Sequence, residues 1–198
     1  MTRGRFSLQL TLPLLLTIGR VGAIPIVMLL FFLPVPYARQ AAMVLFVLAS
    51  VTDWLDGWLA RRWQQESRFG AFLDPVADKL LVVAALILLL YDRPGIVLAL
   101  LATVIIGREI AISALREWMA ELGARKSVAV SWLGKLKTGF QMTAIALMLW
   151  EQPVGELPVY QVGYALLIVS AVLTLQSMFA YLRAAWPQMQ GESDADHS

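Results

Sequence analysis

The chain has 198 residues, of which 59% are hydrophobic and only 15% are charged, and its formal net charge is +2. Because soluble domains usually contain about 25% charged residues, this composition excludes an ordinary water-soluble globular domain. The chain contains no cysteine, which excludes disulfide and thiol chemistry.

Six apolar runs follow one another along the chain, at residues 16–36, 38–60, 74–91, 95–115, 131–150 and 158–182. Each is close to the ~20 residues that a helix needs to cross a bilayer core, and none alternates with the period of two of a barrel strand. The sequence therefore predicts an all-α polytopic membrane protein with six transmembrane helices. We expect residues 1–185 to form one membrane-embedded domain and residues 186–198 a disordered cytoplasmic tail.

The chain begins with two arginines followed by an apolar stretch, and a cleaved signal peptide begins in the same way. However, Arg20 interrupts the stretch, and apolar residues then resume through Leu33. We therefore favour a short interfacial helix at residues 6–18 that leads into the first transmembrane helix, over a signal peptide.

Basic residues are distributed unevenly among the connections. Of the 16 lysines and arginines, only Arg39 and Arg93 lie at the connections 33–39, 91–95 and 151–158; the other 14 lie at the opposite set of helix ends. Short loops rich in Lys and Arg stay on the cytoplasmic side of a membrane. This pattern predicts that both termini, and the stretch 53–78, face the cytoplasm.

The stretch 53–78 concentrates four aspartates between two apolar runs. Helical spacing places two carboxylates beside two small residues on one face at the end of the second run: Asp53, Asp56, Gly57 and Ala60. The start of the third run aligns three residues at i, i+4 and i+8: Gly70, Asp74 and Asp78. Pro75 is expected to stand at the beginning of the third helix.

Four carboxylates this close would repel one another strongly unless a cation lay between them. A donor set of oxygens without His or Cys suits Mg²⁺ or Mn²⁺, and four carboxylates can hold two such ions, an arrangement used in phosphoryl chemistry. We expect a site for two divalent ions. A purely structural charge cluster and a metal-transport pathway are the alternatives, although the acids gather at one membrane face.

The pattern D-x2-D-G-x2-A-R-x8-G-x3-D-x3-D, from Asp53 to Asp78, resembles the signature of the CDP-alcohol phosphotransferase family. Members of this family are six-helix membrane enzymes, usually homodimers, that transfer a phosphatidyl or similar group from a CDP-linked donor to an alcohol and release CMP. The segment PLLLTIGR at 13–20 is similar to the start of such enzymes at Thr17 and Arg20, whereas Leu14 stands where asparagine is usual.

The resemblance implies a role for each signature residue. It implies that four aspartates bind metal, with Asp78 also acting as the general base: Asp53, Asp56, Asp74 and Asp78. It implies that seven residues bind the nucleotide or diphosphate of the donor: Thr17, Asp53, Gly57, Ala60, Arg61, Ser67 and Gly70. The hydroxyl of the acceptor is a weak nucleophile at neutral pH, so a carboxylate that removes its proton is also expected on chemical grounds.

Residues 107–123 and 127–139 resemble the branch of the family whose acceptor is sn-glycerol 3-phosphate. Four bases are expected to bind the phosphate of this acceptor: Arg108, Arg116, Lys135 and Lys137. Glu109 is expected to pair with one of them. The alternative for these bases is ordinary positive-inside topology, with side chains that reach toward the interface.

Together these observations predict an enzyme of the bacterial inner membrane that binds CDP-diacylglycerol and glycerol 3-phosphate and requires Mg²⁺ or Mn²⁺. One alternative is a related enzyme with another acceptor, such as inositol phosphate or phosphatidylglycerol. A second alternative, of another class, is a divalent-cation carrier, which would need polar residues through the membrane midplane.

Overall fold

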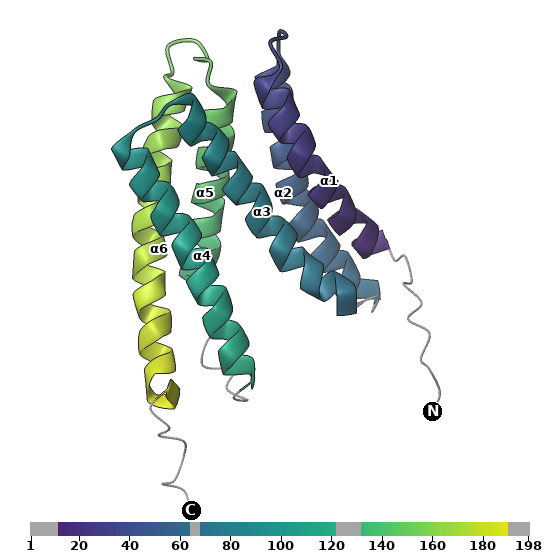
Figure 1. The fold of residues 1–198 in the computed structure, drawn as a ribbon, viewed down its shortest axis with the longest axis vertical. Helices are drawn as coiled ribbons and strands as arrows, with labels where there is room; N and C mark the ends of the chain where they lie inside the picture. Colours follow the sequence, from purple (N-terminus) through teal and green to yellow (C-terminus); the bar gives the residue numbers. More distant parts are fainter. Residues whose placement is uncertain (1–11, 64–67, 122–131, 190–198) are drawn as a thin grey trace, which may run out of the picture. The chain divides into compact units, whose positions relative to one another are not determined.

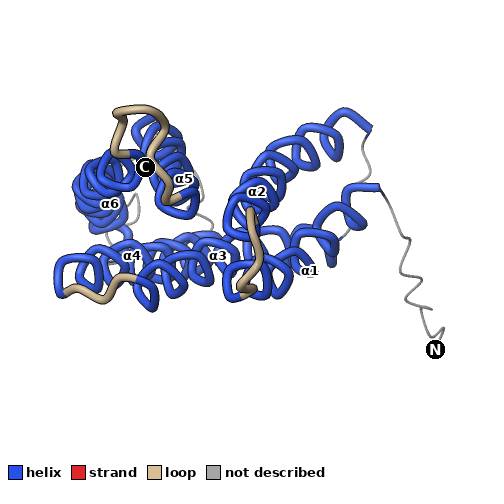
Figure 2. Tube along the Cα trace, turned by 90° about the horizontal axis from the view of Figure 1, so that it is seen from above, coloured by secondary structure: helices blue, strands red, loops and turns tan. Residues whose placement is uncertain are grey.

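The computed structural model describes residues 12–63, 68–121 and 132–189, and nearly all of them are helical (Figure 1). The described chain forms six helices: α1 (Leu12–Phe32), α2 (Ala38–Trp63), α3 (Arg68–Asp92), α4 (Ile96–Glu121), α5 (Trp132–Trp150) and α6 (Val159–Met189). The predicted all-α class and the number of helices are confirmed. Figure 2 shows loops between α1 and α2, between α3 and α4 and between α5 and α6, where turn residues interrupt the apolar runs.

Three of these helices are long and apolar enough to cross a membrane: Leu14–Phe32, Ile96–Ala120 and Val159–Arg183. A shorter apolar stretch, Ala38–Thr52, opens α2. The prediction of membrane-spanning helices is therefore supported for three of the six apolar runs among the described residues.

The first helix ends earlier than its apolar run suggests. α1 ends at Phe32 rather than at residue 36, because Pro34 disfavours helical geometry at the residue before it and lacks an amide hydrogen. Residues 12–18 continue into α1 without a break. The predicted interfacial helix at residues 6–18 is not confirmed, and residues 1–11 lie outside the described part. α6 reaches Met189, beyond the predicted end of the domain at residue 185.

Pro75 does not begin α3, contrary to the prediction. The helix starts at Arg68, and Pro75 lies inside it. Apolar residues beyond the proline provide the reason: Ala77, Leu81 and Ala85 are buried on one face, and such packing can stabilise a helix that a proline deprives of one hydrogen bond.

The chain divides into two compact units, Met1–Leu88 and Leu89–Ser198. In the first unit, α1 and α2 form a helical hairpin. Small side chains at helical spacing line the buried face of α2: Ala38, Ala42 and Ala49, with Phe46 among them. Val27 and Phe31 of α1 are also buried, so the hairpin is held by apolar residues that recur once per turn.

In the second unit, α6 packs against both α5 and α4. Gly163 permits the close approach of α5 and α6, because a Cβ atom at this position would lie 2.9 Å from the carbonyl oxygen of Ala144. At the same end, the α3–α4 and α5–α6 connections meet through Arg93, whose Nη2 donates to Glu151 Oε1 at 2.8 Å. This hydrogen bond raises the pKa of Arg93 above its ordinary value.

Candidate active site

The structure describes the predicted acidic site in part. Residues 53–61 lie in α2 and residues 70–78 lie in α3, so each half of the signature is helical, as its spacing predicts. The surroundings of Gly70, Asp74 and Asp78 are described. Those of the other signature residues in these two helices are not: Asp53, Asp56, Gly57, Ala60 and Arg61. Ser67 lies outside the described residues altogether.

Asp74 and Asp78 stand one turn apart on α3 and are both partly exposed. Helical spacing places both on the side of α3 that also carries Leu81 and Ala85, which are buried further along the helix. Two carboxylates one turn apart repel each other. They present oxygen donors of the kind that divalent cations prefer.

Thr17 of α1 contributes directly to the acidic site, because its hydroxyl donates a hydrogen bond to Asp74 Oδ1. The two residues are 57 positions apart in the chain, and the Thr17 side chain is completely buried. A donor on this oxygen orients the carboxylate and leaves its remaining lone pairs for a ligand. Arg20, one turn further along α1, is also buried, with 2% of its surface exposed.

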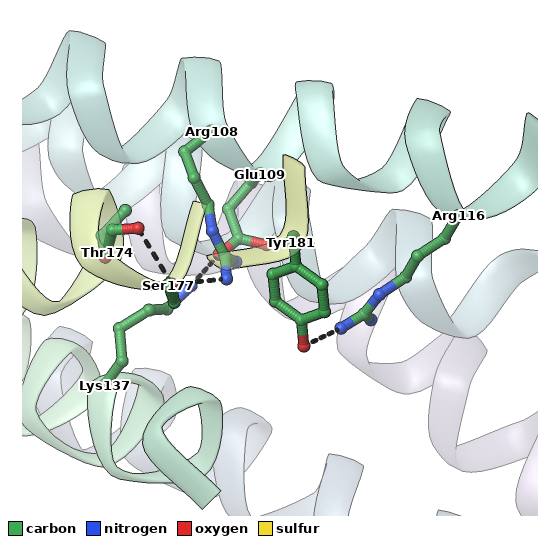
Figure 3. Close-up of polar contacts among 7 residues, drawn as sticks. All are labelled: Arg108, Glu109, Arg116, Lys137, Thr174, Ser177 and Tyr181. Atoms are coloured by element: carbon green, nitrogen blue, oxygen red, sulfur yellow. Dashed lines mark hydrogen bonds and ion pairs between the residues drawn. The ribbon is translucent and has the colours of Figure 1, made fainter. Parts of the chain in front are cut away.

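A second polar site lies in the other unit, where two cations from two helices contact the carboxylate of Glu109 (Figure 3). Glu109 Oε1 accepts hydrogen bonds from Arg108 Nη1 at 3.0 Å and from the ammonium group of Lys137. Arg108 and Lys137 are buried, with 7% and 2% of their surface exposed. The predicted pairing of Glu109 with one of the bases is confirmed, and Glu109 in fact joins two of them.

Helix α6 supplies neutral partners to the two arginines. Arg108 Nη2 donates to the Ser177 hydroxyl at 3.0 Å, and Arg116 Nη2 donates to the Tyr181 hydroxyl at 2.9 Å. We name this group the arginine–lysine cluster; its members are Arg108, Glu109, Arg116, Lys137, Ser177 and Tyr181. Figure 3 shows that its side chains come from α4, α5 and α6.

The arginine–lysine cluster carries more positive than negative charge. It contains three cationic side chains and a single carboxylate, that of Glu109. In addition, the Nε–H groups of Arg108 and Arg116 are buried without a hydrogen-bond partner. Buried donors and uncompensated cations are both costly, and an anion with several oxygens would satisfy both.

Three of the four bases predicted to bind phosphate have described positions. Arg108, Arg116 and Lys137 belong to one cluster, whereas the side chain of Lys135 lies outside the described residues. Ser177 and Tyr181 were missed by sequence reasoning. Their spacing of four residues on α6 was visible, but a serine and a tyrosine on an apolar helix carry no chemical signal until their partners on α4 are known.

No group of three or more His, Cys, Asp or Glu side chains that could hold a metal ion occurs among the described residues. The side chains of Asp53 and Asp56 lie outside that part. The donor set itself fits a hard divalent cation, because Asp74 and Asp78 offer only oxygen ligands and Thr17 orients one of them.

Residues 10–176 match the model of the CDP-alcohol phosphatidyltransferase family. The match covers most of the chain and includes the α2–α3 signature, so the chain belongs to this family. An enzyme of Shigella flexneri serotype 5b (strain 8401), named CDP-diacylglycerol–glycerol-3-phosphate 3-phosphatidyltransferase, is 55% identical over 178 residues, which cover 90% of this chain and 96% of the relative. A protein of the same name from Escherichia coli (strain K12) is 54% identical over 178 residues, which again cover 90% of this chain and 96% of the relative.

Proposed function

We propose that the protein transfers the phosphatidyl group of CDP-diacylglycerol to sn-glycerol 3-phosphate, which forms phosphatidylglycerophosphate and CMP. The names of relatives at 54–55% identity over 90% of the chain support this reaction. The structural observation that carries the choice of acceptor is the arginine–lysine cluster, a buried group with excess positive charge.

The acceptor site follows from the charges of this cluster. A phosphomonoester carries close to two negative charges and several acceptor oxygens near neutral pH. Arg108, Arg116 and Lys137 supply cationic donors, with Glu109 as their sole carboxylate partner in the cluster. An acceptor without a phosphate, such as serine or choline, would not call for this group of bases. Lys135, on the same helix as Lys137, completes the proposed phosphate site.

The proposed chemistry is a single in-line displacement. Asp78 removes the proton from the acceptor hydroxyl, and the resulting oxygen attacks the phosphorus of the phosphatidyl group. A new P–O bond forms to the acceptor as the P–O bond to CMP breaks, and the electron pair of that bond leaves with CMP. No covalent enzyme intermediate is required.

Divalent cations are proposed to bind at Asp53, Asp56, Asp74 and Asp78. When bound, two Mg²⁺ or Mn²⁺ ions would neutralise charge on the diphosphate and stabilise CMP as the leaving group. Thr17 supports this site by orienting Asp74 through their hydrogen bond. The remaining signature residues are proposed to bind the nucleotide and diphosphate of the donor: Gly57, Ala60, Arg61, Ser67 and Gly70.

The proposed setting is the bacterial inner membrane, crossed six times, with both termini and the active site on the cytoplasmic side. Three long apolar helices and the asymmetry of the basic residues support this topology. A membrane location suits the donor, whose acyl chains remain in lipid while its nucleotide reaches water. We also propose one membrane-embedded domain and a homodimer, as the family resemblance implies.

The test is CMP release by the purified full-length chain in mixed micelles that contain CDP-diacylglycerol and Mg²⁺. Glycerol 3-phosphate, inositol phosphate, serine and phosphatidylglycerol are supplied separately. Release with glycerol 3-phosphate alone is expected. Release with a different acceptor would overturn the assignment of the acceptor, and divalent-cation binding without release under any condition would favour the carrier.

A further inference from the structure

Ser177 and Tyr181 lie one turn apart on the same face of α6, and both are buried. Each accepts a hydrogen bond from a different arginine of α4. Both residues lie beyond residue 176, where the match to the family ends.

The hydrogen bonds of Ser177 have a defined direction. Its hydroxyl donates its one proton to the carbonyl oxygen of Thr174 at 2.9 Å, so the lone pairs of the hydroxyl oxygen face Arg108. A guanidinium group can only donate, which makes this oxygen a matched partner for Arg108 Nη2 at 3.0 Å. Ser177 and Glu109 together engage both terminal nitrogens of Arg108, and this fixes the plane of its guanidinium group.

Tyr181 contacts both arginines. Its ring centroid lies 5.2 Å from Cζ of Arg116 and 5.8 Å from Cζ of Arg108, within the range of cation–π attraction. The ring is itself held in a buried apolar cluster with Ile112, Leu115 and Met119. A rigid ring whose hydroxyl accepts from Arg116 limits the conformations of a long and flexible side chain.

We propose that Ser177 and Tyr181 are positioning residues that orient Arg108 and Arg116 toward the phosphate of the acceptor; this inference rests on the proposed function. Both residues act through the arginines and not on the reacting atoms. Their bonds leave N–H groups of each guanidinium available, including the buried Nε–H groups that have no hydrogen-bond partner. Prior orientation of these donors lowers the conformational cost of binding the anion.

The test measures CMP release by the full-length chain against each substrate in turn. Ser177→Ala and Tyr181→Phe each remove one hydrogen-bond acceptor from an arginine and retain most of the packing. Each is expected to raise the KM for glycerol 3-phosphate about tenfold and to change the KM for CDP-diacylglycerol by less than about twofold. Ser177→Thr restores the hydroxyl and is expected to recover most of the loss.

Ser170→Ala is the matched control for Ser177→Ala. Ser170 is also buried on α6, but its hydroxyl has no hydrogen-bond partner, so the same substitution is expected to leave both KM values unchanged. Tyr164→Phe, nearer the start of α6, is the control for Tyr181→Phe. Apparent melting temperatures of all variants show whether the fold survives.

A double-substitution experiment separates positioning from general stability. If Ser177 acts through Arg108, Ser177→Ala should add less than about twofold to the KM in an Arg108→Lys background. An equal rise in both KM values, or the same rise in Ser170→Ala, would overturn the inference.

Failure of the proposed function can be distinguished from failure of this inference. Absence of CMP release with glycerol 3-phosphate in the unsubstituted protein overturns the proposed function and this inference with it. Normal release with an unchanged KM in both Ser177→Ala and Tyr181→Phe overturns the inference alone.

Discussion

Two groups of like charges differ in their surroundings. One is the pair of carboxylates on α3, Asp74 and Asp78, and the other is the arginine–lysine cluster of α4, α5 and α6. The two carboxylates are partly exposed, and Asp74 is oriented by a hydroxyl from α1. In the arginine–lysine cluster, by contrast, a carboxylate of the chain itself joins two buried cations. The difference lies in the partners: a hydroxyl orients one carboxylate of α3, whereas a carboxylate and two hydroxyls hold the three cations of the cluster.

The two sites are expected to have different kinetic roles. A base that acts on the reacting hydroxyl contributes to the chemical step, whereas cations that hold the acceptor phosphate contribute to binding. Substitutions in the acidic site should therefore lower kcat or the response to metal. Substitutions in the arginine–lysine cluster should instead raise the KM for one substrate.

The largest expected effect follows Asp78→Asn. The amide retains the shape of the side chain but cannot accept the proton of the acceptor hydroxyl, so kcat should fall about 10³-fold. The KM for glycerol 3-phosphate should change little. Steady-state CMP release measures both constants, and a variant with normal kcat would show that Asp78 is not the base.

A smaller loss is expected for Lys137→Met. This change removes a buried cation and leaves Glu109 with Arg108 as its one cationic partner in the cluster, so the KM for glycerol 3-phosphate should rise about 30-fold. Arg183→Met, which removes an exposed positive charge from α6, is the control and should leave the KM unchanged. Equal effects of the two substitutions would point to overall charge and contradict a specific phosphate site.

Thr17→Val tests the support of the acidic site. Valine has nearly the shape of threonine but cannot donate to Asp74, so the Mg²⁺ concentration for half-maximal CMP release should rise about tenfold. Thr103→Val is the matched control. The Thr103 hydroxyl donates a hydrogen bond to the carbonyl oxygen of Ala99, which lies in the same helix. An unchanged Mg²⁺ response in Thr17→Val would separate Thr17 from the metal site.

The smallest effect is expected for Arg93→Met, at the other end of the second unit. Arg93 pairs with Glu151 and stacks 4.0 Å from the centroid of the Tyr160 ring, but its side chain is 45% exposed. Loss of such an exposed pair should lower the free energy of unfolding by less than about 1 kcal/mol and leave both KM values unchanged. Thermal unfolding at low and high salt measures the effect, and a loss of more than about 1 kcal/mol would contradict the small contribution expected of an exposed ion pair.

The pairing with Glu151 also predicts how the charge of Arg93 depends on pH. Because this hydrogen bond raises the pKa of Arg93, the stabilisation from its charge is fully present below the ordinary arginine pKa and is lost as the pH rises through the raised value. Titration of Arg93 should therefore leave the unfolding midpoint constant throughout the neutral range.

The sequence alone determined the helical class, the number of helices and the signature from Asp53 to Asp78. These features are local, because a helix is recognised from apolar runs and a signature from spacing along a single stretch. Local reasoning was less reliable at the helix ends. Pro75 was expected to begin α3, but the helix starts at Arg68, and Asp74, just before the proline, is bonded to Thr17 of α1.

The tertiary structure alone decided which polar residues meet. Arg108 and Ser177 are separated by 69 positions, and Arg116 and Tyr181 by 65, so their contacts depend on how α4 and α6 pack. The hydrogen bond from Thr17 to Asp74 likewise joins residues 57 positions apart. Side-chain partners across helices depend on the rotation and register of each helix, and these are determined by the buried apolar faces, not by the polar residues themselves.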